Sequence, residues 1–230
     1  MPKYTQILFD ADNTLFDFST SSHLAFNDLL VHFGVKQDTD LYEVYKPINA
    51  KAWAQLESKE LDMDGVRTTR WQLFWEQLGL AHNSNLSNDI YLENLVKHCF
   101  LLEETIEVLD HLSKIDGLSQ HIITNGMKDA QRPRITKLDL DKYFETITVS
   151  DEIGFAKPDP RFFDHVFAGI SEQEKSRFLV VGDSLRSDIQ GGINYGIDTC
   201  WFNPDGKVND SQIRPTYEIT KLLDLKNIIS

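Results

Sequence analysis

The stretch Ile7-Leu8-Phe9-Asp10-Ala11-Asp12-Asn13-Thr14-Leu15 decides the fold of this chain of 230 residues. A short apolar run rich in β-branched and aromatic side chains is typical of a strand buried on both faces of a parallel sheet. Two carboxylates, Asp10 and Asp12, follow the run directly, and like charges so close repel unless a cation or hydrogen-bond donors intervene. Taken alone, the pair fits an Asx turn or a helix N-cap as well as a functional site.

Three further apolar runs match the first in length and composition. They are Ile122-Ile123 before Thr124, Phe178-Leu179-Val180-Val181 before Gly182-Asp183, and Cys200-Trp201-Phe202 before Asn203. Helices are predicted between these runs over residues 103–115 and 188–195, and Gly196 is suited to end the second of them. This alternation predicts an α/β fold, an open doubly wound parallel sheet with helices on both faces.

The segment from Asp17 to Asn94 lacks a run of this kind and favours several amphipathic helices instead. Leu24, Leu30 and Phe33 lie at helical spacing in one, and Trp71, Phe74, Trp75 and Leu78 lie so in another. We therefore predict an α/β core of residues 1–16 and 95–230, with residues 17–94 inserted after the first strand as a helical cap domain.

Polar motifs stand where the predicted strands end, which is the edge where such sheets bind ligands. The motifs are Thr124-Asn125-Gly126, Lys157-Pro158-Asp159-Pro160 and Gly182-Asp183-Ser184-Leu185-Arg186-Ser187-Asp188. Each has an ordinary structural interpretation, as a β-turn, a helix start or a capping loop. Their coincidence at successive strand ends, together with the Asp10 and Asp12 pair, favours one shared site.

Taken in order, these motifs resemble those of the haloacid dehalogenase-like (HAD) hydrolases: Asp-x-Asp-x-Thr, then Thr, then Lys, then Gly-Asp-x-x-x-x-Asp. The resemblance covers the core of the chain and implies a Rossmann-like HAD core. It implies that Asp10 is a nucleophile that forms an aspartyl-phosphate. It also implies that Asp12 protonates the leaving oxygen and then activates the water that hydrolyses this intermediate.

The same resemblance implies a phosphate site and a metal site. The residues expected to bind the transferring phosphoryl group are Thr124, Asn125, Gly126 and Lys157, of which Lys157 also offsets charge around Asp10. Mg²⁺ is the implied cofactor, held by the carboxylates of Asp10 and Asp183 and the main-chain carbonyl of Asp12. Asp188 is expected to hold metal-bound waters or the Asp183 loop.

Asp12 also distinguishes between reactions, because family members that release a halide lack its equivalent and need no proton donor. Its presence favours a phosphatase over a dehalogenase. The long gap between Asp10 and Thr124 places the insertion where the family carries a type 1 helical cap. Such a cap closes over small esters, so we expect a small-molecule phosphate ester as substrate rather than a protein.

The phrases around Asp10, Thr124, Asp183 and Phe202 are similar to those of bacterial YjjG/YfnB-type pyrimidine 5′-nucleotidases. This resemblance implies hydrolysis of nucleoside monophosphates such as dUMP, dTMP and UMP. A phosphatase for a sugar phosphate, a sialic-acid phosphate or phosphoglycolate would use the same four motifs. A non-catalytic binding protein would not need both a nucleophile and an acid.

Two features of the cap have open interpretations. Arg70 stands where the nucleotidases also tend to carry arginine, so it is a candidate substrate contact, and a solvated arginine on a helix face is the alternative. The cap tryptophans could stack on a base, although tryptophans at helical spacing more often form a domain core, which we favour.

Charge and composition exclude several classes of protein. With 23 Lys and Arg against 36 Asp and Glu, the net charge of −13 disfavours binding to polymeric nucleic acid or to an anionic membrane. Two cysteines form no disulfide framework, no apolar run approaches ~20 residues, and the first residues lack a signal-peptide layout. We expect a cytoplasmic monomer or homodimer.

Overall fold

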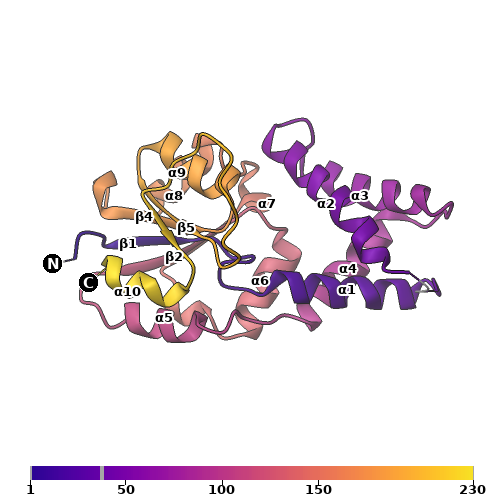
Figure 1. Ribbon diagram of the computed structural model, residues 1–230, viewed down its shortest axis with the longest axis horizontal. Coiled ribbons are helices and arrows are strands. Elements are labelled where there is room, and N and C mark those ends of the chain that lie inside the picture. Colours follow the sequence, from indigo (N-terminus) through magenta and orange to yellow (C-terminus); the bar gives the residue numbers. More distant parts are fainter. Residues whose placement is uncertain (1, 37–38, 230) are drawn as a thin grey trace.

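A computed structural model describes residues 2–36 and 39–229 of the chain. Residues 1 and 230 of the predicted core and residues 37–38 of the predicted cap therefore lie outside the described residues. Figure 1 shows two lobes, one built on a sheet and carrying both chain ends, the other built from helices. No helix in the described ranges combines the length and apolar character needed to cross a membrane.

The sheet has six parallel strands in the order β3-β2-β1-β4-β5-β6. The strands are β1 (Gln6–Phe9), β2 (Ser119–Thr124), β3 (Thr146–Val149), β4 (Phe178–Gly182), β5 (Asp198–Phe202) and β6 (Tyr217–Ile219). The predicted fold class, a doubly wound parallel sheet, is confirmed.

The sequence analysis missed β3 and β6, and both lie at the edges of the sheet. Edge strands are covered on fewer sides, so they need no continuous apolar run. Thr146 and Ile147 are only partly buried, and Glu218 in the middle of β6 is exposed. The four strands that were predicted are the central ones, where both faces are buried.

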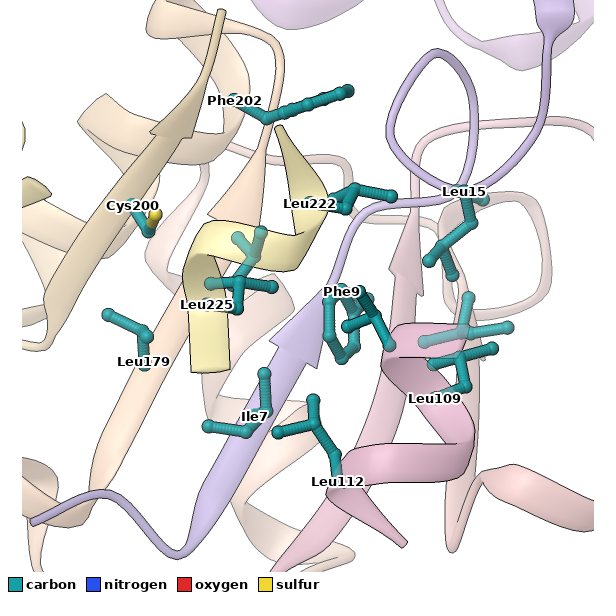
Figure 2. Close-up of a cluster of buried hydrophobic side chains, with 14 of the residues drawn as sticks. Ile7, Phe9, Leu15, Leu109, Leu112, Leu179, Cys200, Phe202, Leu222 and Leu225 are labelled. Carbon is teal, nitrogen blue, oxygen red and sulfur yellow. The ribbon is translucent and has the colours of Figure 1, made fainter. Parts of the chain in front are cut away.

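Alternation along β1 sends its side chains to opposite faces of the sheet, and both faces are covered. Ile7 and Phe9 pack with Leu109 and Leu112 of α5 and with Leu225 of α10, as Figure 2 shows. On the other face Leu8 belongs to a separate apolar cluster. The core helices are α5 (Thr105–Leu112), α6 (Lys128–Lys137), α7 (Ser150–Ile153), α8 (Pro160–Ala168), α9 (Gln190–Tyr195) and α10 (Leu225–Ile229). Gly196 ends α9 in the left-handed region, as predicted.

Each helix of the second lobe begins at an acidic or amide side chain that accepts a hydrogen bond from the first turn. Asp17, Asp40, Asp62 and Asn83 accept from the main-chain N–H groups of Thr20, Tyr42, Gly65 and Leu86. The helices are α1 (Phe18–His32), α2 (Leu41–Glu57), α3 (Met63–Gln77) and α4 (Ser84–Lys97). Part of the acidity of the chain thus serves to start helices.

The division of the chain into core and cap remains a prediction. The ends of the helices nevertheless restrict where a boundary between the two can lie. Helix α4 continues to Lys97 because Leu95 still packs into the interior of this lobe, so the predicted boundary at residue 94 falls inside the helix. Trp71 and Trp75 are fully buried in that interior, whereas Trp53 is only partly buried against it. The interpretation of Trp71 and Trp75 as domain core is therefore correct.

A buried histidine in β2 links this strand to β1 on one side and to the edge strand β3 on the other. The ring nitrogens of His121 lie 2.8 Å from the Thr146 hydroxyl oxygen and 2.8 Å from the Gln6 amide oxygen. A neutral ring with its proton on Nε2 satisfies both partners. Burial lowers the pKa of His121 to about 4.

We expect this residue to make folding stability depend on pH. Because the folded-state pKa lies below the unfolded value of about 6.5, protons bind preferentially to the unfolded chain as pH falls from about 6.5 to 4. Between pH 7.5 and pH 5.0 the wild type should lose about 2 kcal/mol more unfolding free energy than His121→Gln. Urea titrations at the two pH values measure this difference, and equal losses would contradict the assignment.

Candidate active site

The sheet register brings Asp10 and Asp183 to the same edge. Phe9 at the end of β1 is paired with Val181 of β4, and the Asp10 N–H donates to the Val181 carbonyl at 2.9 Å. After Asp10 the chain turns sharply, and Asn13 takes a positive φ of 61°, which asparagine tolerates better than most residues. This turn keeps Asp10 and Asp12 beside the strand ends.

Lys157 is the cation around which the site is organised. It lies in the loop between α7 and α8, and its side chain is 1% exposed. Its ammonium donates to Asp10 Oδ1, Asp188 Oδ1 and the Ile123 carbonyl, each at 2.7 Å. An ammonium has three donors, so any direct bond from Lys157 to a phosphate would replace one of these contacts.

Neighbouring polar groups fix this arrangement. The Asn125 amide donates to the Lys157 carbonyl and accepts from the Lys157 N–H, both at 2.8 Å. One of the two Asn125 amide N–H groups is used in this way, so the second amide N–H or the main-chain N–H would be the donor to a phosphate. Asp188 also accepts from the Ser184 N–H at 3.0 Å, and the Thr14 hydroxyl donates to Asp10 Oδ2 at 3.2 Å.

Three carboxylates crowd around the single ammonium. Asp10, Asp183 and Asp188 each offer an oxygen within 4.8 Å of the others. Burial and then the charge of Asp188 raise the pKa of Asp10 to about 7, against the opposing effect of Lys157. Burial and then the charges of Asp10 and Asp188 raise the pKa of Asp183 well above its usual range. One lysine therefore leaves this cluster short of positive charge.

The donor set fits a hard divalent cation. Mg²⁺ prefers carboxylate and carbonyl oxygens and retains waters, and the cluster offers three carboxylates on the edge of a cavity. Both oxygens of Asp188 accept hydrogen bonds, from Lys157 and Ser184, as both oxygens of Asp10 do from Lys157 and Thr14. The assignment of ligands remains a prediction.

The Asp12 carboxylate has contacts that the sequence analysis missed. Arg134 Nη1 donates to its Oδ1 at 2.7 Å, and Gln131 Nε2 donates to its Oδ2 at 2.6 Å. Both donors come from α6, three residues apart, so they lie on one helix face. The sequence does contain one indication of these contacts. Two polar side chains lie three residues apart soon after the Thr124-Asn125-Gly126 turn.

Three of the four predicted phosphate-binding residues, Thr124, Asn125 and Gly126, line one cavity with the acids, and Lys157 contacts two of those acids. Thr124 is 2% exposed and its hydroxyl accepts from the Gly126 N–H at 3.0 Å, which turns the chain toward Asp10. The cavity, of about 260 Å³, is lined by the core residues Asp10, Asp12, Thr124, Gly126 and Asp183. It therefore brings the predicted site residues of the core together.

The other wall of this cavity comes from the helical lobe. Phe18, Trp53 and Tyr91 contribute rings to it, and Asn49 and Arg70 contribute polar groups. Arg70 is 2% exposed and donates to Asn49 and Asn88 at 2.9 and 2.7 Å, so the alternative of a solvated helix-face arginine is wrong. Because Arg70 is buried in the wall of the cavity, it remains a candidate substrate contact.

Ion pairs join the two lobes beside the cavity. Arg67 of α3 lies 2.6 Å from Asp151 and 3.0 Å from Asp129, both in the core. Lys59 lies 2.9 Å from Asp159, which follows the Lys157 loop. These contacts hold the helical lobe over the strand ends.

The family model for haloacid dehalogenase-like hydrolases matches residues 7–202, most of the chain. The chain belongs to this family. The fold and the order of the acidic motifs around Lys157 are those expected of a HAD hydrolase, and the predicted family is confirmed.

Relatives of the HAD hydrolase match along its whole length. The pyrimidine 5′-nucleotidase PynA of Streptococcus pneumoniae is 32% identical over 98% of this chain and 97% of its own. The pyrimidine 5′-nucleotidase YjjG of Escherichia coli is 28% identical over 99% and 98%. The crystal structure of the putative HAD-hydrolase YfnB of Bacillus subtilis bound to magnesium superposes with a TM-score of 0.91 at 34% identity, covering 98% of each chain.

Gly182 offers a direct test of how tightly this HAD site is packed. A Cβ at Gly182 would lie 2.3 Å from the carboxyl group of Asp188, which Lys157 and Ser184 hold in place. We expect Gly182→Ala to destabilise the protein by about 1–3 kcal/mol in urea unfolding. In the control Gly169→Ala, the new methyl group lies no closer than 3.5 Å to its neighbours, so stability should change little. Equal stabilities of the two variants would contradict this packing.

Proposed function

We propose that this HAD hydrolase is a Mg²⁺-dependent phosphatase that acts through an aspartyl-phosphate. We further propose that its substrates are pyrimidine nucleoside monophosphates such as dUMP, dTMP and UMP. The carrying observation is the cluster of Asp10, Asp183 and Asp188 around Lys157, facing a cavity that the helical lobe closes. The choice of substrate is supported by the names of PynA and YjjG.

In the first step an Asp10 carboxylate oxygen attacks the phosphorus of the ester. The new O–P bond forms as the bond between phosphorus and the 5′ oxygen breaks, and Asp12 gives its proton to that oxygen. Lys157 keeps the attacking carboxylate ionised and oriented through the 2.7 Å contact to Oδ1. The products are the nucleoside and the phosphorylated Asp10.

In the second step Asp12, now ionised, takes a proton from a water molecule. The water oxygen attacks phosphorus, the bond to Asp10 breaks, and inorganic phosphate leaves with Asp10 restored. Thr124 and the Gly126 turn are the groups that would orient the phosphoryl oxygens. Mg²⁺, when held by Asp10, Asp183 and the Asp12 carbonyl, supplies positive charge against the oxygens of the transferring phosphoryl group.

The wall of the cavity suits a nucleoside. Phe18, Trp53 and Tyr91 offer ring faces for a base, and Arg70 and Asn49 offer hydrogen bonds to base or sugar oxygens. Arg70 is already oriented by Asn49 and Asn88, so it would meet the substrate without further ordering. We therefore propose Arg70 as the substrate contact from the helical lobe.

A substrate panel tests the proposed function. We expect release of phosphate from dUMP, dTMP and UMP with Mg²⁺ and a return to background with EDTA. Without the metal, the one lysine beside three acids supplies too little positive charge to hold a phosphate dianion. Sugar phosphates, a sialic-acid phosphate and phosphoglycolate complete the panel. Hydrolysis of one of these esters but not of nucleotides would contradict the proposed substrate class. It would still agree with the proposed phosphatase activity.

The nucleophile has its own test. Asp10→Asn should lower kcat by at least about 10⁴-fold, since an amide cannot form the acyl-phosphate, while leaving the unfolding midpoint within a few degrees. The matched control is Asp116→Asn, at an exposed acid in a loop, which should keep full activity. Turnover by Asp10→Asn near the control rate would refute the assignment.

A further inference from the structure

The two acids of the Asp10–Asp12 pair are held by different buried cations. Lys157 contacts Asp10, whereas Asp12 contacts Arg134 at 2.7 Å and Gln131 at 2.6 Å. Each Asp12 oxygen accepts one of these hydrogen bonds, so the carboxylate is fixed against rotation about its terminal bond. Nothing in the proposed chemistry above uses Arg134 or Gln131.

The burial of Arg134 is costly and needs a reason. Its side chain is 0% exposed, and its guanidinium lies 4.2 Å from the ring centroid of Phe16. Within the described part of the chain, its Nε and Nη2 atoms have no hydrogen-bond partner. Burying a cation with so few hydrogen-bond partners costs stability whatever its role, so the ion pair that it does make calls for an explanation. That contact is the one to Asp12.

The absence of a side chain at Gly126 leaves room for the Gln131 side chain to reach Asp12. A Cβ at Gly126 would lie 2.1 Å from Gln131 Nε2 and 2.7 Å from its Cγ. The φ of Gly126 is not in the left-handed region, so close approach of Gln131, rather than backbone conformation, requires glycine there. The turn that was predicted to bind phosphate thus also admits the side chain that reaches Asp12.

We propose that Arg134 and Gln131 are positioning residues that hold the Asp12 carboxylate where it exchanges its proton with the leaving oxygen and then with water. The inference rests on the proposed phosphatase function. A quarter of the Asp12 side chain is exposed to the cavity, so without these donors it would sample several rotamers. General acid–base catalysis depends on proton transfer at hydrogen-bond distance, and misplacement reduces its contribution.

The test compares two leaving groups. The 5′ oxygen of dUMP leaves as a basic alkoxide and needs a proton, whereas the p-nitrophenolate of p-nitrophenyl phosphate leaves without one. In Arg134→Met and Gln131→Leu we expect kcat/KM for dUMP to fall roughly 10- to 100-fold and kcat/KM for p-nitrophenyl phosphate to fall less than about threefold.

A second readout follows from the second step. Hydrolysis of the aspartyl-phosphate also depends on Asp12, so the variants should release a burst of p-nitrophenolate close to the enzyme concentration before slow turnover. Arg134→Lys keeps a cationic donor and should recover part of the dUMP activity. Arg132→Met, at the exposed neighbouring arginine, is the control and should behave as wild type.

Several outcomes would overturn the inference. Equal losses on both substrates would mean that Arg134 and Gln131 act only on the fold, and unchanged or higher dUMP activity would mean that they do not position Asp12. Gln131→Leu keeps the test open if Arg134→Met fails to fold. If the wild type prefers another alkyl ester, the proposed substrate fails and that ester replaces dUMP here. A wild type inactive on every ester overturns both proposals.

Discussion

The site depends on one constraint: two buried carboxylates, Asp10 and Asp188, share the ammonium of Lys157, and the carboxylate of Asp183 lies close beside them. The contacts of this ammonium at 2.7 Å reach Asp10 after β1, Asp188 after β4 and the Ile123 carbonyl in β2, so one side chain ties together the ends of the three central strands. Removing such a cation would leave acids buried without a partner. The Asn125 amide and the missing side chain at Gly182 are both explained by the need to keep this network in place.

A second consequence is the division of labour between neighbouring acids. Asp10 and Asp12 are two residues apart, yet each has a buried cation of its own, Lys157 for one and Arg134 for the other. Strand alternation would put residues two apart on the same face, so the turn that follows β1, in which Asn13 takes a positive φ, is what brings them to different partners. In the proposed mechanism, this separation would allow one acid to attack phosphorus while the other transfers protons, and both acids line a single cavity. The helical lobe closes that cavity with Arg70 and Trp53.

Much of this was accessible from the sequence because buried strands and their polar ends leave strong local patterns. β1, β2, β4 and β5 were predicted from apolar runs, and Asp10, Thr124, Asp183 and Asp188 from the residues that follow them, whereas Lys157 was predicted from its motif and lies after α7. β3 and β6 were missed because edge strands need less apolar surface.

Features that depend on tertiary packing left at most a weak local pattern, such as the spacing of Gln131 and Arg134 along α6. The burial of Arg70 and the contacts of Arg134 and Gln131 with Asp12 join residues distant in the chain. The reason for glycine at position 126 also became clear only with Gln131 placed beside it.

The most direct measurement is to trap the covalent intermediate. Enzyme mixed with dUMP and Mg²⁺, quenched in acid within one turnover and reduced with borohydride, converts an aspartyl-phosphate to homoserine that peptide mass spectrometry can locate. The account predicts homoserine at position 10 and at no other acid of the cluster. Reduction at Asp12, Asp183 or Asp188, or no reduction while phosphate is released, would contradict it.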